Sequence, residues 1–175
     1  MALAKERTIT PTVALLCFLA DFASKQWARR ALAQGVATPF INGVIQFMLT
    51  ANTGAAFSVG YGHAALMTGV AVAMTAALIL WTVWRERKNA QLPLLDRIGA
   101  GCILGGAIGN LCDRFMRGRV TDFIQFSFVQ FPTFNVADSL IDIGIALLLL
   151  QTLRSSDSKK GECRSNSASG TEPGQ

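Results

Sequence analysis

Four long apolar stretches constrain this chain more than any other feature. They cover approximately residues 11–28, 64–84, 98–115 and 136–153. The second stretch carries no charged residue, and at about 1.5 Å per residue a helix of its length spans roughly 30 Å, the thickness of the hydrocarbon core of a bilayer. We therefore predict an all-α membrane protein with four transmembrane helices in a single membrane-embedded domain, residues 1–154.

The composition also favours lipid as the surroundings of this chain. Only 15% of the 175 residues are charged and 51% are hydrophobic, whereas soluble domains contain about 25% charged residues. The net charge of +5 comes from short clusters of Lys and Arg beside the apolar stretches. Such clusters are typical of topology signals, so we predict no binding of nucleic acid.

The positions of these basic clusters predict the orientation of the chain. Three clusters lie before the first stretch, between the second and third, and after the fourth: Lys5 and Arg7; Arg85, Arg87, Lys88 and Arg97; Arg154, Lys159 and Lys160. The positive-inside rule places all three in the cytoplasm, which agrees with an even number of spans. We therefore predict a multi-pass protein with both termini in the cytoplasm.

Two segments then lie outside the membrane, at residues 31–63 and 116–135. Residues 38–50 form a β-branched and aromatic run, which predicts a small extracytoplasmic β-structure of one or two short strands after the first helix. Residues 155–175 are rich in Ser, Gly, Lys and Glu, so we predict a disordered cytoplasmic tail.

Ionisable residues inside spanning helices are costly, so each one is a candidate for function. Asp21 and Lys25 are four residues apart, which favours a structural ion pair on one face of the first helix. Polar residues of the third stretch recur at three- and four-residue spacing and share a face near its outer end. They are Gly106, Asn110, Asp113, Arg114 and Arg117. Asp113 and Arg114 serve either packing or function.

Two aspartates, Asp122 and Asp138, are the strongest candidates for catalytic residues. Asp122 follows the third stretch and Asp138 opens the fourth, so both lie at the same membrane face. Paired carboxylates in a low dielectric share a proton, and one can activate a water while the other donates to a carbonyl oxygen, as in an aspartic protease. Asp142 lies one turn beyond Asp138, so spacing alone also allows an Asp138–Asp142 pair or a proton relay through Asp142.

The residues that bind metals are scarce. The chain has one histidine, His63, and four cysteines without a Cys-x-x-Cys pair. Three of the cysteines lie in apolar stretches, where free thiols behave as small hydrophobic side chains. We therefore predict neither a metal nor another cofactor.

Five motif blocks resemble one known family. In order they are Asp21-x-x-x-Lys25, the run 52–58 (NTGAAFS), the run 106–114 (GAIGNLCDR), the run 118–124 (GRVTDFI) and the run 134–139 (FNVADS). Together they resemble the bacterial lipoprotein signal peptidases, also called type II signal peptidases, from about residue 10 to 153. Asp142 departs from the pattern, since uncharged residues are usual there.

The resemblance implies an intramembrane aspartic endopeptidase of the bacterial cytoplasmic (inner) membrane. It would cut diacylglyceryl-modified prolipoproteins on the N-terminal side of the lipidated cysteine, near the extracytoplasmic face. The catalytic pair would be Asp122 and Asp138. Residues that bind substrate or support the site would be Asn52, Gly54, Asn110, Arg114, Asn135 and Ala137, with Asp21, Lys25 and Asp113 as structural polar residues.

The sequence also predicts the partners of this chain and allows one alternative function. We expect prolipoprotein substrates and membrane lipid as partners, and a monomer. The alternative is a small membrane transporter or proton-relay subunit that uses Asp21, Asp138 and Asp142 as relay carboxylates. Against it, the carboxylates gather near one face, whereas a conduction path needs polar groups through the whole thickness.

Overall fold

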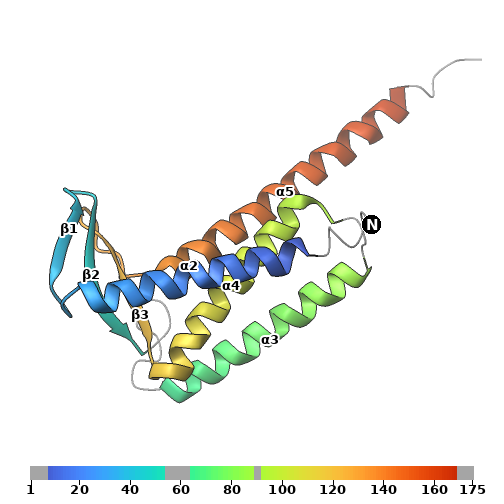
Figure 1. Cartoon of the computed structure of the whole chain (residues 1–175). Helices are drawn as coiled ribbons and strands as arrows, with labels where there is room; N and C mark the ends of the chain where they lie inside the picture. The colour runs from blue at the N-terminus through green and yellow to red at the C-terminus, as the bar shows by residue number, and fades with distance from the viewer. Residues whose placement is uncertain (1–7, 54–63, 89–91, 169–175) are drawn as a thin grey trace, which may run out of the picture.

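The computed structural model describes residues 8–53, 64–88 and 92–168. Within these ranges it contains four helices and one antiparallel sheet (Figure 1). The helices are α2 (Ile9–Ala31), α3 (Ala64–Lys88), α4 (Leu94–Arg117) and α5 (Val136–Ala168); the strands are β1 (Ala37–Ile41), β2 (Ile45–Asn52) and β3 (Val120–Phe126). The helices form a bundle, and the sheet lies at one end of it.

Helix α4 holds the bundle together because it packs against the other three helices. Its glycines bring neighbouring backbones unusually close. A Cβ added at Gly105 would lie 2.5 Å from the carbonyl oxygen of Ala14 in α2, and one at Gly106 would lie 2.5 Å from that of Ala137 in α5. Small residues at such crossings are the usual means of close helix packing in membranes. The crossings bring the ends of α2, α4 and α5 together next to the sheet.

Gly105→Val is expected to lower the melting temperature of the detergent-purified protein, because the added side chain meets backbone of α2 that cannot move aside. Overpacking of this kind costs about 1–3 kcal/mol. Gly69→Val in α3 is the matched control, since a Cβ there has no atom within 4 Å. Equal melting temperatures of the two variants would contradict the tight α2–α4 crossing.

Two helices are long and apolar enough to cross a membrane by themselves. They cover Ala65–Lys88 and Val136–Ser155, and only 11% of each apolar window is buried inside the protein. A core helix of a soluble protein would be mostly buried, whereas α3 exposes large apolar side chains such as Met74 (69%) and Leu80 (70%). This exposed apolar surface fits contact with lipid.

Helices α2 and α4 are also long, but each carries several charged residues within its apolar sequence. Three of these charged residues are buried: Asp21 is 0% exposed, Lys25 1% and Asp113 5%. Buried ionisable residues lower the average hydropathy of a helix without exposing charge to lipid. Two spanning candidates are therefore found where the sequence predicts four.

The sheet has the strand order β1-β2-β3, and both pairings are antiparallel. The predicted strands at 38–50 are confirmed by β1 and β2. The all-α description with a β-structure after the first helix is incomplete, because β3 follows α4 and pairs with β2 from far along the chain. Gly118 ends α4 with a φ of 69°, a left-handed conformation that glycine adopts without steric cost. This turn sends the chain directly into β3.

The tail prediction needs one correction, because α5 continues to Ala168. Residues 155–168, predicted to be disordered, therefore have a helical backbone, and this end of α5 projects beyond the other helices (Figure 1). A helix that is already nucleated gains one hydrogen bond with each added residue, and no proline interrupts the chain before Pro173. Residues 169–175 lie outside the described part.

Candidate active site

Asp122 lies in β3 and is only 2% exposed. Antiparallel pairing places Thr50 of β2 opposite Asp122, and the Thr50 hydroxyl donates to the Asp122 backbone carbonyl at 3.4 Å. Two residues further along β2, Asn52 donates from Nδ2 to Oδ2 of the carboxylate at 3.0 Å. The sheet therefore supplies both the position of Asp122 and one of the donors to its side chain.

Asp138 lies in the first turn of α5, where it forms part of a reciprocal helix cap. The backbone N–H of Asp138 donates to Oδ1 of Asn135 at 3.0 Å, and the backbone N–H of Asn135 donates to Oδ2 of Asp138 at 3.2 Å. This is a capping box, in which the residue before the helix and the third helical residue satisfy each other's free amides. The cap holds one carboxylate oxygen of Asp138 in a defined direction.

Asn135 also joins the two aspartates. It is 0% exposed, and its Nδ2 donates to Oδ1 of Asp122 at 2.6 Å. The same amide nitrogen lies 3.2 Å from Oδ1 of Asn110. One buried side chain thus caps the helix that carries Asp138 and hydrogen-bonds the carboxylate of Asp122.

Asn110 of α4 connects Asp138 to charged residues of α2. Its Nδ2 donates to Oδ1 of Asp138 at 2.8 Å, and its Oδ1 accepts from Nζ of Lys25 at 2.8 Å. Lys25 forms an ion pair with Asp21 at 2.8 Å. Asp21 in turn accepts from the backbone N–H of Ala137 at 2.9 Å. The buried Asp21–Lys25 pair therefore holds the start of α5 in two ways. Asp21 binds the backbone of Ala137, and Lys25 binds Asn110, which in turn binds the side chain of Asp138.

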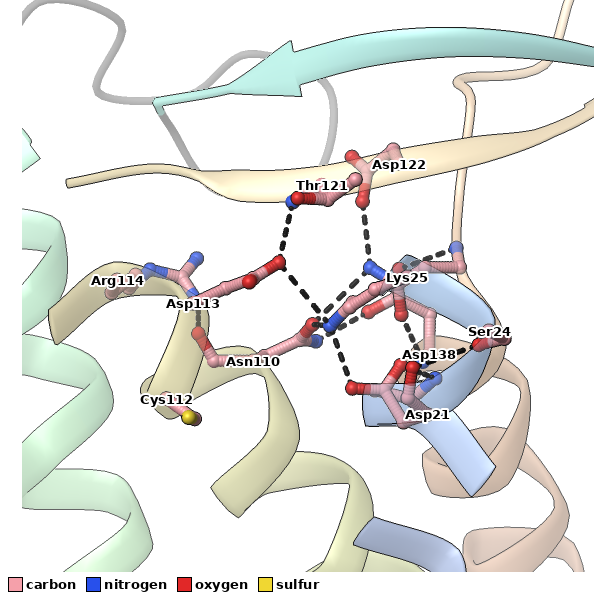
Figure 2. A network of polar contacts seen from close by, with 12 residues as sticks. Asp21, Ser24, Lys25, Asn110, Cys112, Asp113, Arg114, Thr121, Asp122 and Asp138 are labelled. Carbon is pink, nitrogen blue, oxygen red and sulfur yellow. Dashed lines mark hydrogen bonds and ion pairs between the residues drawn. The ribbon is translucent and has the colours of Figure 1, made fainter. Parts of the chain in front are cut away.

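Asp113 of α4 holds β3, the strand that carries Asp122. Its Oδ2 accepts from the backbone N–H of Thr121 at 2.9 Å, and its Oδ1 lies 3.2 Å from Nη1 of Arg29. Arg29 also donates to the hydroxyl of Thr121 at 2.8 Å. Figure 2 shows Thr121 and Asp122 on β3 facing the polar side chains at the ends of α2, α4 and α5. Residues from five elements, α2, α4, α5, β2 and β3, thus meet in one hydrogen-bonded network.

The remaining predicted residues occupy different positions relative to this network. Arg114 donates from Nη1 to the carbonyl oxygen of Asn110 at 3.4 Å, and its charge interacts with both Asp122 and Asp138. Asp142 is exposed on α5 and forms no hydrogen bond or ion pair with any residue in the described ranges. Gly54 and His63 lie outside those ranges. The described residues contain no group of three or more His, Cys, Asp or Glu side chains that could hold a metal ion.

The pKa of Asp122 is raised from its ordinary 3.8 to about 6, first by burial and then by the nearby charge of Asp138. The hydrogen bonds from Asn135 and Asn52 and the charge of Lys25 act in the opposite direction. Each contribution favours one protonation state: low dielectric and a like charge favour the neutral carboxyl, and donors and cations favour the carboxylate. Asp122 is thus able to keep a proton well above the pH at which an exposed aspartate loses it.

This raised pKa predicts how stability depends on pH. The folded protein binds the Asp122 proton more tightly than the unfolded chain does, so the resulting stabilisation is complete below about pH 4 and is lost as the pH rises through about 6. The difference between 3.8 and about 6 corresponds to at most about 3 kcal/mol. We expect the melting temperature of the wild type to fall relative to that of Asp122→Asn between about pH 4.5 and about pH 7.5. A constant difference between the two melting temperatures across this pH range would show that the pKa of Asp122 is not raised.

Sequence reasoning missed three residues of this network: Arg29, Thr50 and Thr121. Arg29 carried a signal, because it is four residues after Lys25 and eight after Asp21 and so shares their helix face. Thr50 and Thr121 carried none, because their roles follow from the pairing of β2 with β3. Backbone partners across a sheet are determined by register, which local sequence does not show.

The fold is similar to that of solved membrane enzymes. One structure described as a bacterial membrane enzyme superposes with a TM-score of 0.75 at 26% identity, covering 86% of this chain and 90% of that chain. A second, of the same description, gives a TM-score of 0.71 and covers 82% and 92%. The arrangement of helices and sheet is therefore that of a bacterial membrane enzyme.

Comparison with known sequences identifies the family. Residues 13–154 match the family described as signal peptidase (SPase) II. A lipoprotein signal peptidase of Nostoc punctiforme is 36% identical over 148 residues, 85% of this chain and 91% of that protein. One of Dehalococcoides mccartyi is 44% identical over 147 residues, 79% and 84% of the two chains. The chain belongs to the signal peptidase II family, proteases that remove signal peptides from prolipoproteins.

Proposed function

We propose that this chain is an intramembrane aspartic endopeptidase. Its substrates would be diacylglyceryl-modified prolipoproteins, cut on the N-terminal side of the lipidated cysteine. One observation carries the catalytic assignment: the carboxylates of Asp122 and Asp138, from β3 and α5, are joined through Asn135 at the end of the bundle. The family membership favours this reading over a transporter or proton-relay subunit.

The two carboxyl groups suit the two proton transfers of amide hydrolysis. Burial favours the neutral form of Asp122, so we assign the shared proton to Asp122 and the role of general base to Asp138. Asp138 takes a proton from water as its oxygen adds to the scissile carbonyl carbon, and Asp122 donates its proton to the carbonyl oxygen. When the diol collapses, Asp138 returns its proton to the leaving amine of the modified cysteine, and Asp122 regains one from a hydroxyl.

The surrounding residues keep this pair in place during the reaction. Asn52 and Asn135 donate to separate oxygens of Asp122, and Asn110 donates to Asp138. Arg114 adds a positive charge near both carboxylates, which offsets part of their mutual repulsion. In this proposal the buried Asp21, Lys25 and Asp113 are positioning residues, since each acts on an aspartate through another group.

The proposed membrane placement follows from the bundle and its charges. All four helices would span the bacterial inner membrane, with both termini in the cytoplasm and the aspartates near the extracytoplasmic face. The start of α2 and the end of α5 both lie away from the sheet (Figure 1), as this topology requires. The exposed apolar helix surfaces allow the acyl chains of the substrate to stay in lipid. We propose that a single copy of the chain suffices, because the described residues of one chain supply both aspartates and the side chains that hydrogen-bond them.

The proposal is tested by incubating the detergent-purified protein with a diacylglyceryl-modified prolipoprotein. We expect mass spectrometry to show one cut, immediately before the modified cysteine, and no cut in the same precursor without the diacylglyceryl group. An aliquot treated with EDTA should react at the same rate, because two carboxyl groups supply both proton transfers. Absence of cleavage by a well-folded protein would refute the proposed activity, and loss with EDTA would refute the metal-free mechanism.

A further inference from the structure

Asp142 is a carboxylate without a structural role in the described part of the chain. It lies in α5 within the apolar stretch Val136–Ser155, which is able to cross a membrane. Its side chain is exposed, and it forms no hydrogen bond or ion pair with any described residue. A carboxylate in such a helix is costly unless it meets a partner. The other intramembrane carboxylates near it, Asp21 and Asp138, are bound within the network.

The helix geometry places Asp142 on the same side of α5 as Asp138. Residues of α5 that face α4 include Ala137, Ile141 and Leu148, which meet the α4 glycines. At about 100° per residue, Asp138 and Asp142 both lie to one side of this contact line. Ile145 and Leu149 continue the same flank and are 45% and 60% exposed. Beyond Asp138, this side of α5 is therefore an apolar surface that carries a single carboxylate, that of Asp142.

A substrate bound for cleavage along this flank would place unpaired hydrogen-bond donors next to it. A signal segment crosses lipid as a helix, yet its backbone must be extended where a water and two carboxyl groups reach the scissile amide. Each residue that leaves the helix exposes an N–H group, and an unpaired N–H in hydrocarbon costs several kcal/mol. A carboxylate next to the unwound segment would satisfy such donors.

The spacing indicates which residues of the substrate these are. Asp142 is one turn from Asp138, a rise of about 6 Å along α5. An extended chain advances about 3.3 Å per residue, so Asp142 lies about two residues from the scissile carbonyl. From Asp138 to Asp142, helix α5 runs away from the sheet (Figure 1), which is the direction in which the signal segment of a bound substrate would extend. The N–H groups within reach belong to the second and third residues before the modified cysteine.

We propose that Asp142 is a substrate-binding residue that accepts a hydrogen bond from a backbone N–H of the unwound signal segment, at the second or third residue before the cleaved bond. This inference rests on the proposed peptidase function. It assigns Asp142 to substrate binding, apart from the chemistry of Asp122 and Asp138.

A double-mutant cycle between enzyme and substrate backbone tests the contact. Three synthetic diacylglyceryl-modified peptides are compared: one with all amides, and two in which an ester replaces the N–H of the second or third residue before the cysteine. Wild type, Asp142→Leu and Asp142→Asn are assayed for kcat and KM with each peptide, and their melting temperatures report folding. Ile145→Ala, on the same flank, is the control for a general effect of altering this surface.

We expect one ester to lower kcat/KM of the wild type at least about fivefold. Asp142→Leu should lose about the same factor with the all-amide peptide and lose no more with that ester, because the contact is already absent. Asp142→Asn keeps an acceptor oxygen and should lose less than Asp142→Leu. Ile145→Ala should respond to the ester as the wild type does.

Two results would overturn the contact: full activity of Asp142→Leu, or an ester effect of equal size in wild type and Asp142→Leu. A wild type that leaves the all-amide peptide uncut would instead refute the peptidase function itself, so the two failures are distinguishable.

Discussion

Asp122→Asn and Asp138→Asn are each expected to abolish prolipoprotein cleavage, with kcat at least about 10⁴-fold below that of the wild type. Each asparagine keeps the size of the side chain but cannot take up and release the proton that hydrolysis requires. Because the two carboxyl groups act as a unit, the double variant should be no slower than either single variant. The measurement is single-turnover cleavage of a diacylglyceryl-modified precursor by protein purified from membranes.

Asp142→Asn is the matched control for these two variants, since it makes the same substitution one turn from Asp138 on the same helix. It should reduce the rate only a few-fold, because an amide oxygen still accepts a hydrogen bond. All three proteins should elute as folded species in detergent. Near-normal turnover by Asp122→Asn or Asp138→Asn would exclude that residue from the chemistry, and a 10⁴-fold loss in Asp142→Asn would bring Asp142 into it.

Asn135→Asp is expected to produce the second-largest loss, at least about 100-fold in kcat. Aspartate caps a helix as well as asparagine does, so α5 should keep its first turn and Asp138 its backbone position. The substitution places an oxygen where Nδ2 now donates to Asp122 at 2.6 Å. A third carboxylate at this place would repel Asp122 and raise its pKa further, because a like charge favours the neutral form.

Asn135→Ser separates the two functions of Asn135. Serine also caps a helix, but it brings no negative charge and its side chain is too short to bridge to Asp122. We expect Asn135→Ser to lose less activity than Asn135→Asp. The pH dependence of kcat should move to higher pH in Asn135→Asp. Equal losses without a pH change in Asn135→Asp would show that Asn135 acts only as a helix cap.

The candidate site could be predicted in part because its residues occur in recognisable local contexts. Asp21 and Lys25 stand out since charged residues in an apolar helix are rare, and Asn110 shares a helix face with Asp113 and Arg114 by spacing alone. Asn135 was predicted from family resemblance to bind substrate or support the site, and in the structure it forms a capping box with Asp138. Its hydrogen bonds to both aspartates join segments that no local pattern relates.

The fold could be predicted where length and hydropathy decide it. The four helices occur at the four apolar stretches, but α5 extends to Ala168, because helical hydrogen bonds do not require apolar side chains. The third strand was missed for a different reason. Residues 120–126 form a strand by pairing with β2, and that pairing depends on α4 and Gly118 bringing the two segments together.

The sequence by itself therefore determined the membrane character of this protein, the places of its helices and the identity of its ionisable residues. These properties depend on burial of apolar surface and on spacing within one helix, which act over a few turns of chain. Only the tertiary structure decided that Asn135 joins Asp122 to Asp138 and that Asp142 has no partner among the described residues. Such contacts depend on the crossings of α4 with α2 and α5, where glycines allow backbones to approach and directional hydrogen bonds select one arrangement.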